Sequence, residues 1–189
     1  MKRITIISLV VALQACAIQS TPKSQPQTEP VNQPQCIGSV ELTDELTAKF
    51  KSVQDDELLT KALGEPDLGK LCQGQVYQSE TKVVLYRAWN STNPNSRYGQ
   101  WWALTEPSGL VRDYRKDYEI CYQWSPLDKL SQCTLKAGTR VVIGNGQSAK
   151  CSDYLTYPVS ASQQVFIEDA ENAVINCTEY NAVMSWQLE

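Results

Sequence analysis

The start of the chain determines the environment in which the rest of it must fold. Two positive charges, Lys2 and Arg3, come first, and an apolar run of about ten residues from Ile4 to Leu13 follows. A charged start, a short apolar stretch and a small residue are typical of an export signal. The run is too short for the ~20 apolar residues that a membrane-spanning helix needs. We therefore expect residues 1–15 to be a signal peptide that is removed on export.

The end of this signal reads Leu13-Gln14-Ala15-Cys16 and resembles the bacterial lipobox, with Gln14 as a departure from the usual pattern. The resemblance implies cleavage before Cys16, a diacylglyceryl thioether on its sulfur and an acylated amine, with palmitate as a suitable label. Two or three acyl chains meet the requirement for stable anchoring. Ala17 stands where aspartate would retain the protein in the inner membrane. Transport to the outer membrane is therefore implied, facing the periplasm or the cell surface. The alternative is an ordinary secretory cleavage beside an unrelated cysteine.

The remaining cysteines also fit export. Six follow the anchor, and an even number in an exported chain predicts disulfides. We favour sequential pairing among the 15 possible connectivities. This pairing would join Cys36 to Cys72, Cys121 to Cys133 and Cys151 to Cys177. Metal ligation is the weaker alternative, because the chain has no C-x-x-C pair and no histidine, and we predict no metal site.

Composition narrows the classes of function. The absence of histidine excludes Ser-His-Asp and Cys-His catalysis, and it removes the commonest ligand of catalytic zinc. After loss of Lys2 and Arg3, 15 basic residues remain against 21 acidic ones, which gives a net charge of −6. An acidic chain without basic clusters argues against nucleic-acid binding and against electrostatic docking on membranes. We therefore expect the membrane link to be the lipid alone.

The mature chain divides into a tether and one domain. Residues 16–35 are rich in Pro, Gln, Ser and Thr and lack apolar periodicity, which predicts a disordered spacer. Residues 36–189 suit a single disulfide-bonded domain. We expect helices from Thr43 to Val53 and from Asp55 to Leu63, and then strands rich in β-branched and aromatic residues. Without regular βα alternation, the prediction is an α+β fold in which N-terminal helices precede a small, mainly antiparallel β core.

Some local expectations concern the second half of the chain. Short helices are expected at 113–119 and 126–130. Strands are expected at 82–89, 139–144 and 164–167, with two closing strands after residue 172, and the sequence Gly144-Asn145-Gly146 predicts a turn.

An ordered set of short motifs runs from about residue 82 to residue 170. It comprises Tyr86-Arg87-Ala88-Trp89, Gly99-Gln100-Trp101-Trp102, Pro107-Ser108-Gly109, Lys136-Ala137-Gly138-Thr139 and Gln164-Val165-Phe166-Ile167. The set resembles small bacterial toxin domains of the ADP-ribosyltransferase fold. The resemblance implies an ADP-ribosyltransferase-like domain with NAD as the cofactor, if the domain is an enzyme.

The resemblance also implies roles for particular residues. Arg87 would hold the dinucleotide phosphates, for which a guanidinium is well shaped. Trp101 or Trp102 would lie beside the nicotinamide, and Gln164 would occupy the place of the usual catalytic glutamate. The Ser-Thr-Ser strand and the Glu-x-Glu pair of the family are absent. Structural alternatives remain open: Arg87 in an ion pair or interface, the tryptophans in packing, and Gln164 as the start of a strand.

Three functions follow from these observations. The first is an envelope-anchored binding or accessory module whose partner is a small ligand or an envelope protein. The second is an active NAD glycohydrolase or ADP-ribosyltransferase toxin. The third is an immunity or exclusion lipoprotein. NAD is scarce in the periplasm, which favours the binding module over the enzyme.

Overall fold

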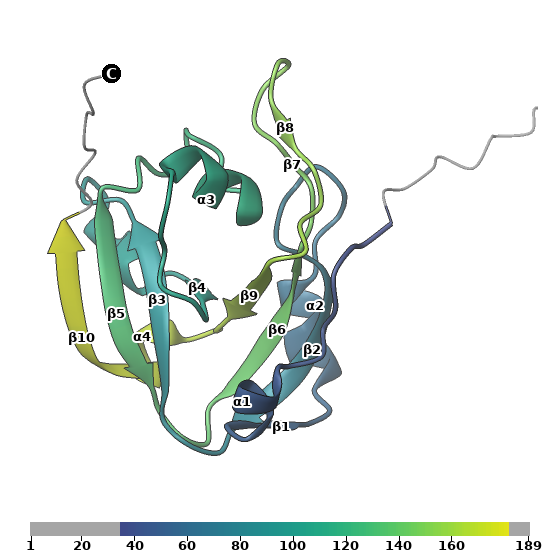
Figure 1. The fold of residues 1–189 in the computed structure, drawn as a ribbon, viewed down its shortest axis with the longest axis vertical. Helices are drawn as coiled ribbons and strands as arrows, with labels where there is room; N and C mark the ends of the chain where they lie inside the picture. The colour runs from purple at the N-terminus through teal and green to yellow at the C-terminus, as the bar shows by residue number, and fades with distance from the viewer. Residues whose placement is uncertain (1–34, 182–189) are drawn as a thin grey trace, which may run out of the picture. The chain divides into compact units, whose positions relative to one another are not determined.

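The computed structural model describes residues 35–181. The signal peptide, Cys16 and nearly all of the tether lie outside these residues. The described chain folds around one eight-stranded sheet in which every neighbouring pair of strands is antiparallel, in the order β1-β2-β6-β9-β4-β3-β5-β10 (Figure 1). The expected α+β class with a mainly antiparallel core is confirmed. None of the helices described is long and apolar enough to cross a membrane.

The strands of the large sheet differ greatly in length. They are β1 (Phe50–Ser52), β2 (Leu71–Ser79), β3 (Val83–Trp89), β4 (Trp101–Ala103), β5 (Lys129–Leu135), β6 (Arg140–Gly146), β9 (Gln163–Phe166) and β10 (Val174–Asn181). A separate hairpin of β7 (Ala149–Lys150) and β8 (Thr156–Tyr157) projects from the sheet beside α3 (Val111–Asp117) in Figure 1.

The core lies on both faces of the middle of the sheet. Successive side chains of β6 alternate between two apolar clusters, as the period of a strand requires. Val141 and Ile143 join the larger cluster, whereas Val142 packs with Leu58 and Phe166 in the smaller one beneath α2 (Asp56–Ala62). Because β6 is covered on both faces, its sequence is a continuous apolar run and does not alternate between apolar and polar residues.

The two expected N-terminal helices form, but the first is much shorter than expected. Thr43 precedes α1 (Asp44–Thr47), which ends after one turn. Phe50 then enters β1 and pairs with Ser79, so the expected helix to Val53 is wrong. Burial of Phe50 against Tyr77 in the core outweighs its helical spacing. The second helix is α2, capped by the Asp55 carboxylate, which accepts from the Leu58 N–H at 3.1 Å.

Three disulfides form, but two of the expected pairings are wrong. Cys36 pairs with Cys72 as expected. The other bridges join Cys121 to Cys151 and Cys133 to Cys177. Cys133 lies on β5 and Cys177 on the neighbouring β10, with Cα atoms 4.1 Å apart. These two sulfurs therefore come together because their strands pair, although the two cysteines are distant in the sequence.

Two further local expectations are wrong. The residues Gly144 to Gly146 continue β6 and form no turn, because Gly144 pairs with both Gly74 and Gln164. A side chain at Gly144 would collide with the backbone of β2, where the ideal Cβ would lie 2.0 Å from the Gln73 carbonyl oxygen. The expected helix at 126–130 is absent, and β5 begins there instead. The expected closing strands form one strand, β10, and residues 182–187 lie outside the described chain.

Candidate functional site

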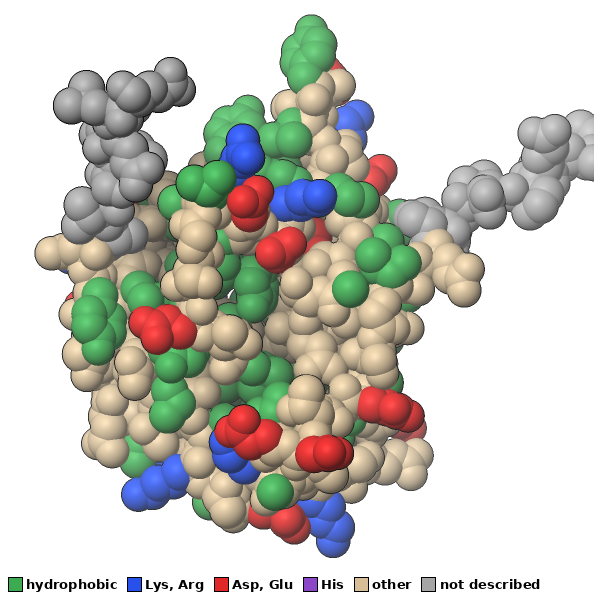
Figure 2. All heavy atoms as spheres, viewed as in Figure 1, with side chains coloured by type: hydrophobic (Ala, Val, Ile, Leu, Met, Phe, Trp, Pro, Cys, Tyr) green, Lys and Arg blue, Asp and Glu red, His purple; other side chains and the backbone are tan. Residues whose placement is uncertain are grey.

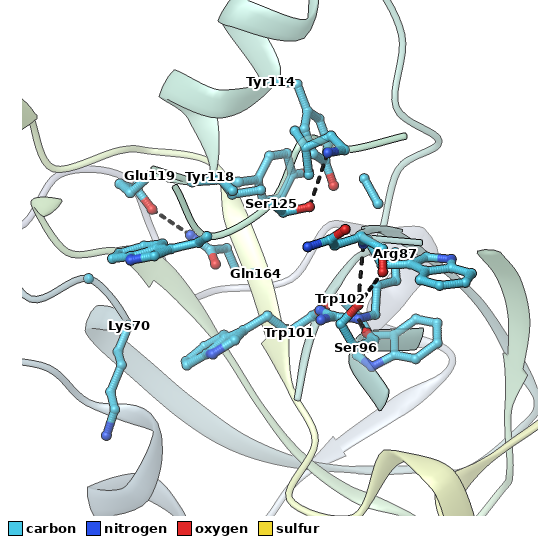
Figure 3. A pocket seen from close by; sticks show the side chains of 17 residues that line it. Lys70, Arg87, Ser96, Trp101, Trp102, Tyr114, Tyr118, Glu119, Ser125 and Gln164 are labelled. Atoms are coloured by element: carbon cyan, nitrogen blue, oxygen red, sulfur yellow. Dashed lines mark hydrogen bonds between the residues drawn. The ribbon is translucent and has the colours of Figure 1, made fainter. Parts of the chain in front are cut away.

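A cavity of about 200 Å³ lies between the sheet and the segment formed by α3 and the loop after it. The space-filling view shows a hollow on this face, with hydrophobic side chains in and above it (Figure 2). The sheet contributes Arg87 from β3, Trp101 and Trp102 from β4 and Gln164 from β9. The opposite wall comes from residues 114–127, and Lys70 lies at one side (Figure 3).

The four ligand-binding residues expected from the sequence therefore line one cavity. They come from three strands that are neighbours in the sheet, in the order β9-β4-β3. Ala103 of β4 pairs with Gln164 on one side and with Tyr86 on the other. The short strand β4 thus sets the spacing between Arg87 and Gln164, which are far apart in the sequence.

Arg87 is a largely buried cation that contacts neutral acceptors. Its Nε donates to the Ser96 carbonyl oxygen at 2.7 Å and its Nη1 to the Trp101 carbonyl oxygen at 2.6 Å. Gly99 packs against the guanidinium so closely that a Cβ there would lie 2.1 Å from Nη2. No carboxylate of residues 35–181 forms an ion pair with Arg87. The structural alternative of an ion pair is therefore not found in this part of the chain.

Burial has a clear effect on this guanidinium. It lowers the pKa of Arg87 to about 10, which leaves the group charged at neutral pH. A buried charge is expensive unless an opposite charge or several hydrogen bonds compensate it. Two carbonyl oxygens provide part of that compensation. An anion entering the cavity would provide the rest.

The aromatic residues around the cavity have different roles. Trp102 is 2 % exposed, belongs to the main core and donates from Nε1 to the Gly99 carbonyl oxygen at 2.8 Å, so it is chiefly a packing residue. Trp101 is half-buried, and its ring centroid lies 5.0 Å from that of Phe166. On the opposite wall, the rings of Tyr114 and Tyr118 lie 4.5 Å apart. Of the two expected tryptophans, Trp101 is the one available to a ligand.

Gln164 is 5 % exposed and does more than begin a strand. Its Nε2 donates to Oε2 of Glu119 at 2.6 Å, and Figure 3 shows this bond at the cavity wall. The other carboxyl oxygen of Glu119 is buried and has no hydrogen-bond partner among the described residues. Glu119 is the only carboxylic acid among the residues that line this cavity in the described chain.

Burial holds the Glu119 carboxyl in its neutral form. It raises the pKa of Glu119 to about 9, and the hydrogen bond from Gln164 opposes the shift only in part. The Ser160 hydroxyl donates to the Asp117 carbonyl oxygen at 2.8 Å, so it leaves Oε1 of Glu119 without a donor. At neutral pH the charged groups of the cavity are therefore the cations Arg87 and Lys70.

Sequence reasoning missed Glu119, Tyr114, Tyr118 and Trp124 as cavity residues. The segment 113–119 reads as a short amphipathic helix, and nothing local indicates which side it presents to the sheet. The Cys121–Cys151 bridge, which the expected pairing did not include, ties this segment to the hairpin of β7 and β8. In the sequence, the residue that indicates the position of this segment is Cys121, because its bridge to Cys151 fixes residues 114–127 opposite the sheet.

The described residues also limit the chemistry. Within residues 35–181, no group of three or more His, Cys, Asp or Glu side chains is arranged to hold a metal ion. The residues that line the cavity offer a guanidinium, an ammonium, amides, a neutral carboxyl, hydroxyls and aromatic rings. Comparisons with protein-family models, with characterised proteins and with solved structures find no match to this chain.

Proposed function

We propose that the protein is an exported, lipid-anchored module that binds a small anionic molecule with a planar ring. The observation that carries the proposal is that Arg87, Trp101 and Gln164 line one cavity. The anionic group of the ligand would contact Arg87, the ring would contact Trp101, and polar ring substituents would contact Gln164. Each of these three side chains borders the cavity.

The size and charge of the cavity support this class of ligand. Pockets for drug-sized ligands hold roughly 300–1,000 Å³, whereas this cavity holds about 200 Å³. The space suits one ring and its polar substituents, with the rest of a larger ligand outside. With Glu119 neutral, the positive charge of Arg87 is not cancelled inside the cavity. A nucleotide that carries a pyridine ring, such as NAD, meets these requirements and agrees with the resemblance to ADP-ribosyltransferase-like domains.

The proposed location rests on the signal and on the disulfides. Three bridges close the described domain, and disulfides persist in oxidising compartments such as the bacterial periplasm. The proposed anchor, Cys16, lies outside the described residues. An outer-membrane lipoprotein with a binding domain remains the simplest function that uses both the leader and the cavity.

A second candidate function is hydrolysis of NAD at the bond between ribose and nicotinamide. The observation that favours it is the shared cavity of Arg87 and Gln164, because an amide near the ribose can stabilise positive charge that develops there. The measurement is release of nicotinamide from NAD by the purified domain. Turnover that disappears in Gln164→Ala would show that the protein is an enzyme. If wild type shows no turnover, only the binding function remains.

The binding proposal is tested by titrating the disulfide-bonded domain with NAD, ADP-ribose and nicotinamide while recording tryptophan fluorescence. We expect NAD and ADP-ribose to bind, and Arg87→Gln to weaken both by at least about tenfold through loss of a charge-assisted hydrogen bond. Arg112→Ala is the matched control, because that arginine is 82 % exposed and does not line the cavity. Circular dichroism checks that each variant folds. Equal affinities in wild type and Arg87→Gln would refute the proposal.

A further inference from the structure

Glu119 occupies a backbone position that does not suit glutamate. It follows α3 directly after the C-cap residue Tyr118, and its φ is +47°, in the left-handed region. The Ile120 N–H donates to the Arg115 carbonyl oxygen at 2.9 Å, which is the bond of a Schellman motif. Glycine is the usual residue at this point because other side chains are strained there. A strained residue beside a cavity points to a role in that cavity.

The side chain of Glu119 is also costly in its surroundings. It is 2 % exposed, and its Oε1 has no partner among residues 35–181. Its carboxyl packs on Gly146 of β6, where a Cβ would lie 1.9 Å from Oε2. An alanine at position 119 would relieve the crowding against Gly146 but would keep the strained φ, whereas an alanine at position 146 would collide with Oε2. Strain, burial and an unpaired oxygen therefore combine at one residue, and a buried polar atom without a partner calls for an explanation.

We infer that Glu119 contacts the ligand, and that its Oε1 hydroxyl donates a hydrogen bond to a carbonyl oxygen on the ligand's ring. The inference rests on the proposed function and adds to it the class of ring, which is a planar ring with a carboxamide or a similar uncharged carbonyl. Gln164 already occupies Oε2, so Oε1 is the atom left for a ligand. Glu119 and Arg87 line the same cavity, and Figure 3 shows them on opposite sides of it.

An uncharged acceptor fits this oxygen better than a charged one. Burial raises the pKa of Glu119 to about 9, and the nearby Asp117 adds to the shift. A second anion on the ligand would be repelled by Asp117. The titratable groups that face Glu119 or share its cavity are Asp117, Tyr114, Tyr118, Lys70 and Arg87. Burial raises the pKa of Tyr118 to about 12 and lowers that of Arg87 only to about 10. Glu119 therefore titrates below both.

The test compares NAD, which has a carboxamide on its ring, with ADP-ribose, which lacks the ring. Glu119→Ala should weaken NAD about tenfold, the effect of about one neutral hydrogen bond in a buried site, and leave ADP-ribose unchanged. Glu119→Gln should keep the affinity for NAD within about threefold, because its amide copies a neutral carboxyl with one acceptor and one donor. Glu80→Gln, an exposed site, is the matched control.

A pH series adds a second readout. The affinity of wild type for NAD should fall as pH rises through about 9, the pKa to which burial raises Glu119, whereas Glu119→Gln should show no such fall. Equal affinity for NAD in Glu119→Ala and wild type would overturn the inference. Equal losses in Glu119→Gln and Glu119→Ala would overturn it too, because the group would then act as a carboxylate. If neither NAD nor ADP-ribose binds to wild type, the proposed function is wrong and the inference falls with it.

Discussion

The amide Nε2 of Gln164 and the carboxyl Oε2 of Glu119 lie 2.6 Å apart and join β9 to the segment that follows α3. The bond crosses from the sheet to the opposite wall of the cavity. Gln164 is fixed by strand pairing with Ala103 and Gly144, so it provides a rigid reference for the more irregular wall. Burial raises the pKa of the carboxyl that it holds to about 9, so this group loses its proton only at alkaline pH.

Glu119→Gln should make the stability of the protein less dependent on pH. The pKa of Glu119 rises from 4.5 to about 9 on folding, so between these values the folded state holds a proton that the unfolded state has lost. The free energy of unfolding of wild type should therefore fall, relative to Glu119→Gln, by about 1.4 kcal/mol per pH unit from pH 5 to pH 8. Urea unfolding of both proteins across this range measures the difference. Parallel curves would show that Glu119 is ionised in the folded protein.

Removal of the Cys121–Cys151 bridge should loosen the wall of the cavity. The double variant Cys121→Ala/Cys151→Ala should lose about 3.6 kcal/mol of stability, as expected for a loop of this length, given a separation of 30 residues. Hydrogen exchange should accelerate most in residues 111–127, and NAD should bind more weakly. The matched control removes Cys36–Cys72, with a separation of 36 residues. It should cost similar stability without the loss of affinity, and equal losses of affinity in both variants would contradict the assigned role.

Gly99→Ala should displace the guanidinium of Arg87. The new Cβ would lie 2.1 Å from Nη2, and the φ of Gly99 is −63°, which alanine adopts freely. The effect should therefore come from the collision and not from the backbone. We expect a loss of affinity for ADP-ribose of about tenfold or more, measured by fluorescence titration. Gly138→Ala meets no atom within 4 Å but places alanine at a φ of +84°, so it should cost stability. Because Gly138 does not line the cavity, this variant should leave the affinity unchanged. An unchanged affinity in Gly99→Ala would show that Arg87 does not contact the ligand.

The anchor can be tested independently of the cavity. Cells that express the full chain should incorporate labelled palmitate into the wild-type protein, and Cys16→Ser should abolish the labelling and release the protein from membranes. The reason is that a single early cysteine would carry the acyl chains. Labelling that persists in Cys16→Ser would disprove the proposed anchor. Binding of NAD by the domain would then still stand.

The sequence predicted individual strands and some residues of the cavity better than it predicted contacts between distant segments. Arg87 and Gln164 were identified from short motifs on strands whose β-branched and aromatic residues predict their own structure. Glu119 could not be identified as a cavity residue from the sequence. Its contacts are with Gly146 and Gln164, which are distant in the sequence and come close only in the folded chain. The pairing of Cys133 with Cys177 depends in the same way on the order of β5 and β10 in the sheet. Phe50 shows the reverse case, in which tertiary packing overrides a helical pattern.

The most direct test of the central claim is a titration of the ¹⁵N-tryptophan-labelled domain with NAD, followed through its indole N–H signals. A Trp101→Phe variant assigns the signal of Trp101, the ring that is half-buried at the cavity. We predict that this signal shifts in a saturable manner in wild type, and that Arg87→Gln needs at least about tenfold more NAD for the same shift. A Trp101 signal that does not move in wild type at millimolar NAD would contradict the account.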